Sequence, residues 1–304
     1  MFVVSFSYMD NLPVNNSIST ILPIFNEADS VAKTICSLDQ VMGNLNINYE
    51  IIAVNDGSTD KTEEILASLS LDNIKIVSHD KNRGYGASLK TGIKIAQHPW
   101  ILITDADGTY PEHHIPELIA ETRKHDMVIG ARNGVKVHDT FFRKIGRGIV
   151  QKFASYVSGS KIEDINSGMR IFKKENAEKF WSLFPDGFSF TSTITVASHS
   201  NGHRVKYIPI DYNKRSGKSS IKPAKDFIGF MSLIAKLAIY YRPLKVFVPL
   251  ALILWILAVT TVFVSYFWLG YLLDATIAVL LISGVQVLIF GFLADMIVKR
   301  FYND

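Results

Sequence analysis

The sequence contains a single cysteine, Cys36, among its 304 residues. One cysteine cannot form an intramolecular disulfide, so the chain does not have a disulfide framework, and a reducing compartment suits it. Cys36 lies between apolar neighbours in a predicted helix, and we expect it to pack in the core. The net charge is only +4. That mild excess gives no support to nucleic acid as a partner.

Two nucleotide-binding signatures are also missing. The sequence has no Walker A motif, and the run Gly84-Tyr85-Gly86-Ala87-Ser88-Leu89 ends in Leu where the dinucleotide fingerprint has Gly. This run also follows the third predicted strand, whereas the fingerprint belongs after the first. Cofactor-dependent redox chemistry is therefore not supported. No basic segment precedes the apolar stretch Phe2-Val3-Val4, so no signal peptide is predicted, and residues 1–18 are expected to form a loosely ordered lead-in.

Charge is absent from two long segments near the C-terminus, Val246–Gly270 and Ala275–Ala294. About 20 such residues cross the hydrocarbon layer as a helix, so residues 244–304 are predicted to form a transmembrane hairpin with a short tail. The alternative is a pair of buried helices in a soluble core. Lys and Arg flank the hairpin but are missing from its turn, which predicts that the large N-terminal domain and both termini are cytoplasmic. The flanking residues are Lys236, Arg242, Lys245, Lys299 and Arg300.

Short β-rich runs alternate with helical patterns from Ser19 to about Arg132, which predicts an α/β fold with a mostly parallel, doubly wound sheet. The predicted strands are 20–24, 49–54, 74–78, 100–104, 127–130 and 204–212. The predicted helices between them are 27–42, 59–69, 86–96 and 111–124. We expect one domain over residues 19–222.

Two further segments are predicted to be amphipathic helices that carry basic residues, Phe141–Ser158 and Lys225–Tyr241. Such helices suit a membrane surface or an anionic ligand. Packing against the sheet with solvated charges explains either helix about equally well. Because the second helix leads directly into the hairpin, residues 223–243 are predicted to lie at the membrane interface.

Carboxyl- or amide-bearing loops follow four successive predicted strands, at residues 25–27, 55–60, 79–84 and 105–107. The carboxyl ends of parallel strands meet at one edge of a sheet, where such folds bind ligands. The most informative loop is Asp105-Ala106-Asp107, since two carboxylates one residue apart can share a divalent cation that clamps a diphosphate. The competing interpretation is a helix cap, with Asp107 or Thr109 capping a helix that begins near Pro111.

Six motifs together resemble a known family. They are Leu22-Pro23-Ile24-Phe25-Asn26-Glu27, Val54-Asn55-Asp56-Gly57-Ser58-Thr59-Asp60, Asn82-Arg83-Gly84, Asp105-Ala106-Asp107-Gly108, Ser167-Gly168-Met169-Arg170-Ile171-Phe172 and Arg215-Ser216-Gly217-Lys218-Ser219-Ser220. In this order they are similar to family 2 glycosyltransferases of the GT-A fold. The last two motifs resemble the polyprenyl-phosphate branch, which includes dolichol-phosphate mannose and glucose synthases and bacterial undecaprenyl-phosphate glycosyltransferases. The resemblance spans roughly residues 19–222, and the hairpin resembles that branch's membrane anchors.

The resemblance implies a nucleotide-sugar donor and a Mg²⁺ or Mn²⁺ ion. Asp107 would bind the metal directly, Asp105 would bind ribose or the metal through water, and Arg215 would complete the catalytic set. The implied donor-binding residues are Pro23, Phe25, Asn26, Glu27, Asp56, Arg83, Asp105, Ala106, Asp107, Arg215 and Lys218. A metal at this position would neutralise charge on the departing diphosphate.

The acceptor implied by the resemblance is a polyprenyl (dolichyl or undecaprenyl) phosphate. Arg132, Arg143 and Arg147 are the candidates for its phosphate, although relatives have Ser where Arg147 aligns. Two other departures are Thr193, where many relatives have Glu, and Ser220, where many have Lys. The expected reaction is inverting transfer of a hexose from a UDP- or GDP-sugar at the cytoplasmic membrane face.

Two other functions stay open at this level. A hydroxyl acceptor, as in glycolipid or polysaccharide synthesis, would need a base, and Asp164 is the candidate. A non-catalytic membrane scaffold is disfavoured because Asp107 and Arg215 are both present. A homo-oligomer is compatible with the sequence. The residues do not identify the sugar, the nucleotide base or the polyprenol.

Overall fold

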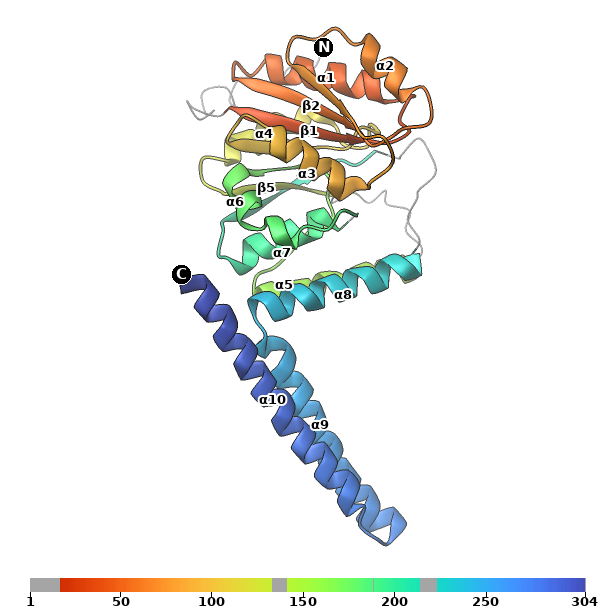
Figure 1. Ribbon diagram of the computed structural model, residues 1–304, viewed down its shortest axis with the longest axis vertical. Helices are drawn as coiled ribbons and strands as arrows, with labels where there is room; N and C mark the ends of the chain where they lie inside the picture. Colours follow the sequence, from red (N-terminus) through yellow and green to blue (C-terminus); the bar gives the residue numbers. More distant parts are fainter. Residues whose placement is uncertain (1–16, 133–140, 188, 214–222, 304) are drawn as a thin grey trace.

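The computed structural model describes residues 17–132, 141–187, 189–213 and 223–303. An α/β domain lies above two helices that run side by side, and a long helical hairpin extends away from them (Figure 1). The strands of the domain are β1 (Ile18–Ile24), β2 (Tyr49–Asn55), β3 (Ile74–Ser78), β4 (Trp100–Ile103), β5 (Met127–Arg132), β6 (Arg170–Lys173) and β7 (Val205–Ile210).

The strands form one sheet in the order β3-β2-β1-β4-β6-β5-β7. β6 is antiparallel to both of its neighbours, and every other pairing in this sheet is parallel. The predicted α/β class with a mostly parallel sheet is therefore confirmed. β6 itself was not among the predicted strands, because its four residues directly follow a turn-rich segment.

Helices connect the strands on both faces of the sheet. The helical elements of the domain are α1 (Val31–Gly43), α2 (Thr62–Ser68), α3 (Tyr85–Ile95), η2 (Glu112–His114), α4 (Ile115–Glu121), α6 (Lys174–Lys179), η3 (Trp181–Leu183) and α7 (Phe190–Ser200). Residues of α1, α2 and α4 join one buried cluster, and residues of α3, α6 and α7 join a second cluster on the opposite face. The sheet is thus covered on both sides, as expected for parallel strands.

Alternation along the central strands divides their side chains between the two clusters. In β2, Ile51 and Ala53 belong to the first cluster, whereas Ile52 and Val54 belong to the second. All four are fully buried. A strand whose side chains are buried on both faces reads as a continuous apolar run, which is why these strands were readily predicted.

Cys36 corrects one prediction, because its side chain is exposed. The buried residues of α1 include Val31, Ile35, Leu38 and Met42, which recur at helical spacing on one face. Cys36 follows Ile35 by one residue and is therefore turned about 100° around the helix axis, away from that face. Apolar neighbours in sequence do not place a helical residue in the core when the periodicity excludes it.

Arg170 opens β6 and is fully buried. Its guanidinium donates to the carbonyl of Ser167, to the carbonyl of Thr191 at 2.8 Å and to Thr195 Oγ1 at 2.7 Å. These bonds join the segment before β6 to the first turns of α7. Because a buried cation is costly unless its donors are satisfied, this network fixes where β6 enters the sheet.

Two helices lie beneath the domain, α5 (Phe141–Ser158) and α8 (Pro223–Tyr241). They pack with α7 around a third buried cluster that contains Val150, Ala154, Val196 and Ile234. Part of each predicted amphipathic helix is therefore buried against the domain. The side chains of residues 141–147 of α5 and most of those in the first two turns of α8 lie outside the described residues.

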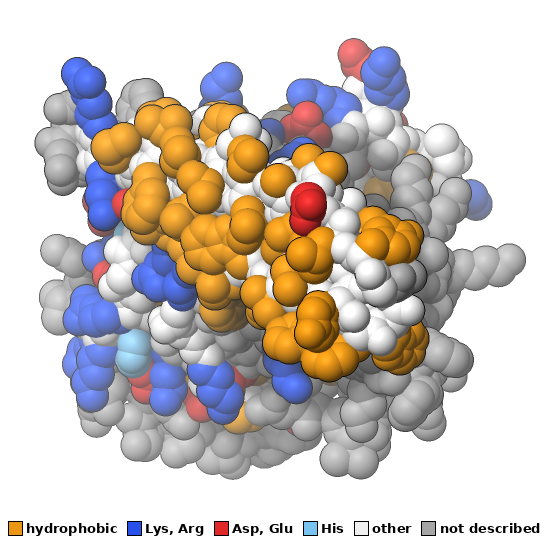
Figure 2. Space-filling view, turned by 90° about the horizontal axis from the view of Figure 1, so that it is seen from below, with side chains coloured by type: hydrophobic (Ala, Val, Ile, Leu, Met, Phe, Trp, Pro, Cys, Tyr) orange, Lys and Arg blue, Asp and Glu red, His pale blue; other side chains and the backbone are white. Residues whose placement is uncertain are grey.

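The hairpin consists of α9 (Leu244–Val264), a π-helical turn η4 (Ser265–Leu269) and α10 (Asp274–Asn303). Segments Leu244–Trp268 and Asp274–Arg300 are long and apolar enough to cross a membrane. The small residue Gly284 lies against the Trp255 indole, so the helices approach closely there. Large apolar side chains cover the outside, as the view from below shows, with Lys and Arg around the margin of that surface (Figure 2). Such an apolar surface is unusual for a water-exposed helix pair.

The start of the hairpin is attached to the end of α5. Lys245 Nζ donates to the carbonyl of Tyr156, and the Tyr156 hydroxyl donates to the carbonyl of Lys245 at 3.1 Å. The Lys245 ammonium also lies 5.2 Å from the centre of the Tyr156 ring. We call this pair the α5–α9 clasp. It ties the hairpin to the domain through side chains as well as through α8.

We expect Arg170→Met to destabilise the domain. The substitution keeps an extended apolar side chain but removes every Arg170 bond: the buried Ser167 carbonyl loses its donor, the Thr195 hydroxyl loses the donor to its oxygen, and the Thr191 carbonyl keeps only its bond from Thr195 Oγ1. A buried acceptor left unpaired costs about 1–3 kcal/mol, so the total loss is about 3 kcal/mol or more. For a domain of this size, this loss corresponds to a fall in Tm of roughly 6–12 °C, measurable by thermal unfolding of the full chain in detergent.

Arg204→Met is the matched control. The Arg204 side chain is 64% exposed and pairs with Asp126 at 3.3 Å. The Asp126 carboxylate is only 16% exposed, but it keeps Lys173 at 3.0 Å, so loss of the exposed Arg204 partner should cost about 1 kcal/mol and lower Tm by about 4 °C at most. Equal changes in Tm for the two variants would show that the Arg170 network does not support the domain.

Candidate functional site

Six strands end at the same edge of the sheet, and β6 begins there. Arg170 pairs in register with Ile103 of β4 and with Ile129 of β5, so the Ser167–Arg170 segment meets the ends of those strands. The loops that follow β1, β2, β3 and β4 leave from this edge as well. The convergence expected from the sequence is therefore present, and we call this edge the candidate site.

The loops after β1 and β2 are joined by hydrogen bonds. Asn26, whose φ of 56° places it in the left-handed region, accepts a bond from the Thr59 N–H at 2.8 Å through Oδ1. The Asn26 N–H donates to Ser58 Oγ at 3.0 Å, and the Glu27 N–H donates to Thr62 Oγ1 at 2.9 Å. Phe25 is 42% exposed beside this junction. An exposed aromatic ring on a rigid loop offers a flat surface to a planar ligand.

Asp56 is buried at the end of β2 and organises the loop after β3. Its carboxylate accepts from the backbone N–H groups of Arg83 at 2.9 Å and Gly84 at 2.8 Å. His79 Nδ1 lies 2.7 Å from Asp56 Oδ1, and the other ring nitrogen lies 2.9 Å from Thr91 Oγ1. Asp56 therefore holds the 79–84 loop against the site. No role was predicted for His79, because a contact between residues 23 positions apart leaves no local pattern in the sequence.

A close backbone approach explains one glycine of this region. A Cβ on Gly57 would lie 2.6 Å from the backbone carbonyl carbon of Lys81. Gly57 also has a φ of +68°, in the left-handed region that side chains disfavour. The second and third loops can therefore touch only because this position has no side chain.

Asp105 is held by residues from two other parts of the chain. The Tyr85 hydroxyl donates to Asp105 Oδ1 at 3.1 Å. Burial, and then the neighbouring charge of Asp105, raise the pKa of Tyr85, so the phenol stays protonated and remains a donor. Gly168 packs against the same carboxylate, because a Cβ on Gly168 would lie 2.6 Å from Asp105 Oδ2. The Gly168 N–H in turn donates to the Tyr110 hydroxyl at 2.7 Å.

Asp107 is held within its own loop. Its Oδ1 accepts from the Thr109 N–H at 3.1 Å and from Thr109 Oγ1 at 2.6 Å. The capping interpretation is wrong, because neither η2 nor α4 has a side-chain cap, and Asp107 instead orders the turn at residues 107–109. The buried Ala106 between the two acids accepts a bond from Thr34 Oγ1 at 3.2 Å through its carbonyl. Two carboxylates at the end of β4 form an oxygen donor set of the kind that Mg²⁺ and Mn²⁺ prefer, so the residues fit such an ion.

Arg132 ends β5 and is paired with Asp164. The guanidinium donates through Nε and Nη2 to the two carboxylate oxygens, each at 2.8 Å, and the Arg132 N–H adds a bond at 3.1 Å. The guanidinium carbon also lies 5.5 Å from the centre of the Tyr212 ring. Burial by itself raises the pKa of the Asp164 carboxyl, but the bonds and charge of Arg132 outweigh burial and lower the pKa.

Some of the remaining predicted site residues have described side chains, and others do not. Pro23 and Glu27 are partly buried next to the candidate site, and Arg83 is exposed with its N–H on Asp56. Arg215 and Lys218 lie outside the described residues, in the 214–222 gap. Arg143 and Arg147 lie on α5, in the part whose side chains are not described. Their roles therefore stay predictions.

The chain is similar to known proteins in both of its parts. Residues 19–181 match the model of Glycosyl transferase family 2, and residues 242–299 match that of the GtrB C-terminal hairpin. The chain is 26% identical over 216 residues to the low-salt glycan biosynthesis hexosyltransferase Agl6 of Haloferax volcanii, covering 69% of this chain and 51% of that protein. It thus spans about half the length of that relative.

Two further relatives have informative names. The dolichyl-phosphate hexose transferase of Haloferax volcanii is 23% identical over 212 residues, with 68% of this chain and 88% of that protein covered. The dolichol-phosphate mannosyltransferase of Pyrococcus furiosus is 30% identical over 215 residues, with 67% of this chain and 59% of that protein covered.

A solved structure shares the fold. It is glucosyl-3-phosphoglycerate synthase from Mycobacterium tuberculosis in complex with uridine diphosphate, with a TM-score of 0.62, 14% identity, and coverage of 78% of this chain and 86% of that one. Another complex of that enzyme contains Mn²⁺, uridine diphosphate and glucosyl-3-phosphoglycerate, with a TM-score of 0.58, 17% identity, and coverage of 78% and 84%. The domain therefore has the GT-A fold. Since the family model matches more than half of the residues, the chain belongs to glycosyl transferase family 2.

Proposed function

We propose that this protein transfers a hexose from a nucleotide-sugar donor to a polyprenyl phosphate, with inversion at the anomeric carbon. One observation carries the proposal: a family 2 domain and a GtrB-type hairpin occur in one chain. The names of the dolichyl-phosphate and dolichol-phosphate relatives agree with it. The hairpin would bring the domain to the membrane in which such an acceptor is dissolved.

The donor would bind at the ends of β1, β2 and β4. The exposed Phe25 ring and the 79–84 loop organised by Asp56 would form the nucleoside subsite, with Arg83 beside it. Asp107, supported by Asp105, would hold Mg²⁺ or Mn²⁺, whose positive charge would stabilise the departing nucleoside diphosphate. Arg215 and Lys218 are proposed to contact the same phosphates.

The acceptor is itself an anion, which creates an electrostatic problem. Two unit charges about 5 Å apart repel by about 3 kcal/mol at an effective dielectric constant of 20. Arg132, Arg143 and Arg147 are proposed to offset this repulsion, Arg132 from the end of β5 and the others from α5. The transfer would break the bond from the anomeric carbon to the diphosphate oxygen and form a bond to a phosphate oxygen. A phosphate is already ionised at neutral pH, so no strong base is required.

The membrane arrangement is proposed from charge. Lys236, Arg242 and Lys245 precede the first span, Lys299 and Arg300 follow the second, and the turn has no Lys or Arg. The C-terminal end of α8, which leads into the first span, and the C-terminal end of α10 both lie on the domain side of the hairpin (Figure 1). This distribution favours a cytoplasmic catalytic domain and cytoplasmic termini.

The proposed activity predicts a specific acceptor preference. The full-length protein in detergent, supplied with Mn²⁺ and labelled UDP- or GDP-hexoses, should label polyprenyl phosphate but not the matched polyprenol. The lipid product is separated by chromatography, and its linkage is checked by mass spectrometry. Label on polyprenol alone would reject the proposal in favour of a hydroxyl acceptor.

Asp107→Asn should lower turnover by about 100-fold or more, because a direct metal ligand is lost.

The control for Asp107 is Asp72→Asn, which changes an exposed acid in the loop after α2. This variant should keep wild-type turnover, and both variants should keep the wild-type Tm. Wild-type turnover in Asp107→Asn would remove the metal assignment but leave the acceptor preference intact.

Gly168→Ala tests whether the position of Asp105 matters. The added Cβ would lie 2.6 Å from Asp105 Oδ2, so the carboxylate must move while the fold is kept. A displacement of this order near reacting groups costs about 100-fold in turnover. Gly229→Ala is the control, because among the described residues a Cβ there meets no atom within 4 Å beyond its own turn of helix. Equal turnover in the two variants would show that the Gly168 contact does not serve the reaction.

The Arg132–Asp164 pair bears on the hydroxyl-acceptor alternative. A carboxylate whose pKa is lowered by an arginine is a weak base, so this pairing favours a structural role for Asp164. A lowered folded-state pKa means that the pair stabilises the fold above the unfolded pKa of about 4. That stabilisation is lost as the pH falls through the lower folded-state value.

We therefore expect Asp164→Asn to reduce the free energy of unfolding by about 3 kcal/mol at pH 7. The difference from wild type should shrink at pH 3 and below, as urea unfolding at several pH values would show. Glu163→Gln is the control, since the ion pair that the Glu163 carboxylate makes among the described residues is with the exposed Lys161 at 3.3 Å. A difference that grew on acidification would contradict the assigned direction of the pKa shift.

A further inference from the structure

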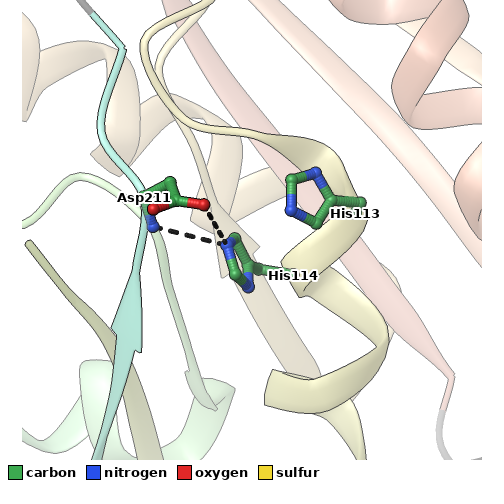
Figure 3. Close-up of side chains that lie close together, drawn as sticks. All are labelled: His113, His114 and Asp211. Atoms are coloured by element: carbon green, nitrogen blue, oxygen red, sulfur yellow. Dashed lines mark hydrogen bonds and ion pairs between the residues drawn. The ribbon is translucent and has the colours of Figure 1, made fainter.

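Three potential metal ligands meet beside the candidate site. His113 and His114 lie on η2, directly after the Asp105–Asp107 loop, and Asp211 follows the end of β7. One ligand atom from each of the three residues lies within 4.8 Å of the others. Figure 3 shows the Asp211 carboxylate facing the His114 ring, with His113 alongside. The motifs that define the donor site do not include any of these residues.

The His114 ring turns its Nε2 edge toward Asp211. This nitrogen accepts the Asp211 N–H in a long bond of 3.3 Å and lies 3.9 Å from Asp211 Oδ2, so a cation would replace that N–H at the Nε2 lone pair. The opposite nitrogen, Nδ1, lies 3.8 Å from Glu117 Oε2. Metal-binding histidines commonly have a carboxylate behind the non-ligating nitrogen, which fixes the tautomer and the ring orientation. Glu117 lies on that side of the His114 ring, at a distance longer than a hydrogen bond.

From this geometry we propose that His113, His114 and Asp211 bind a transition-metal cation of the Zn²⁺ class. Two imidazoles and one carboxylate favour Zn²⁺ or Co²⁺ over Mg²⁺, which prefers oxygen ligands alone. Ligands about 2.0–2.2 Å from a tetrahedral Zn²⁺ are separated by about 3.4 Å, so the side chains must close by roughly 1.5 Å. The Asp211 side chain is 84% exposed, and side-chain rotation is enough for this movement. Water would supply the fourth ligand.

The position of the cluster gives the cation a structural effect. The Asn213 N–H donates to the Thr109 carbonyl at 2.9 Å, and the Tyr212 ring lies 5.1 Å from that of Tyr110. The segment after β7 is therefore already attached to the loop that bears Asp107. A cation shared by η2 and Asp211 would add a third attachment between them. Its effect would be to stiffen the wall of the candidate site without entering it.

The test uses Co²⁺ as a spectroscopic substitute for Zn²⁺. The full-length protein in detergent is first saturated with Mg²⁺ to occupy the oxygen ligands of the donor site, and Co²⁺ is then added. We expect one equivalent to bind with the intense visible absorption of four- or five-coordinate Co²⁺, and Zn²⁺ to displace it. Asp211→Ala should weaken binding by more than about 100-fold, and Glu117→Gln by about tenfold.

Two controls separate this site from other histidines and from the donor site. His125 Nδ1 lies 3.1 Å from Glu121 Oε2. His125→Gln should therefore leave Co²⁺ binding unchanged, and so should Asp107→Asn. Equal Co²⁺ affinity in wild type and Asp211→Ala would overturn the proposal, as would a weak six-coordinate spectrum. Loss of the signal in Asp107→Asn would overturn it too, by assigning the cation to the donor site.

Discussion

The buried guanidinium of Arg170 is the constraint on which the candidate site depends. A cation without water must direct its N–H groups at acceptors, and here these come from Ser167, Thr191 and Thr195. Satisfying them brings α7 to the start of β6 and fixes the turn before it. Gly168 lies in that turn and carries the Asp105 carboxylate against its backbone. The need to satisfy the buried Arg170 guanidinium therefore helps to fix the position of the Asp105 carboxylate at the edge of the sheet.

The other loops of the site are held by the same kind of long-range tether. Asn26 binds the loop after β2, Asp56 binds the loop after β3, and Tyr85 binds Asp105. Each of these loops is thus fixed by a residue from a different loop or helix. Donors and acceptors fixed in advance need no rearrangement when a charged substrate arrives, which is the basis of electrostatic catalysis. Family 2 membership and the hairpin match then indicate which charged substrates to test.

Sequence periodicity was sufficient to predict the parallel strands and their edge, because buried strands and acid-bearing loops leave local patterns. Side-chain partners left no such pattern. The pairing of Asp56 with His79 spans 23 residues, and that of Arg132 with Asp164 spans 32. The sequence showed the motif around Arg170. It did not show that Arg170 begins an antiparallel strand, because a strand of four residues has too little periodicity to be recognised. The prediction that Cys36 is buried was wrong although the sequence did contain the needed pattern. The helical periodicity of α1 places Cys36 outside the buried face, but the prediction relied on its apolar neighbours in sequence.

The α5–α9 clasp has a consequence for how substrates meet. Tyr156 and Lys245 bond reciprocally, and α8 continues into the hairpin almost without a linker, so two connections hold the domain to the hairpin. In a bilayer, the height and tilt of the sheet edge would be fixed by the angle at which the hairpin crosses. The proposed lipid acceptor would then reach the sheet edge by lateral diffusion in the bilayer, whereas the proposed soluble donor would reach it by diffusion through water. The two reactants would thus meet at one edge of the sheet.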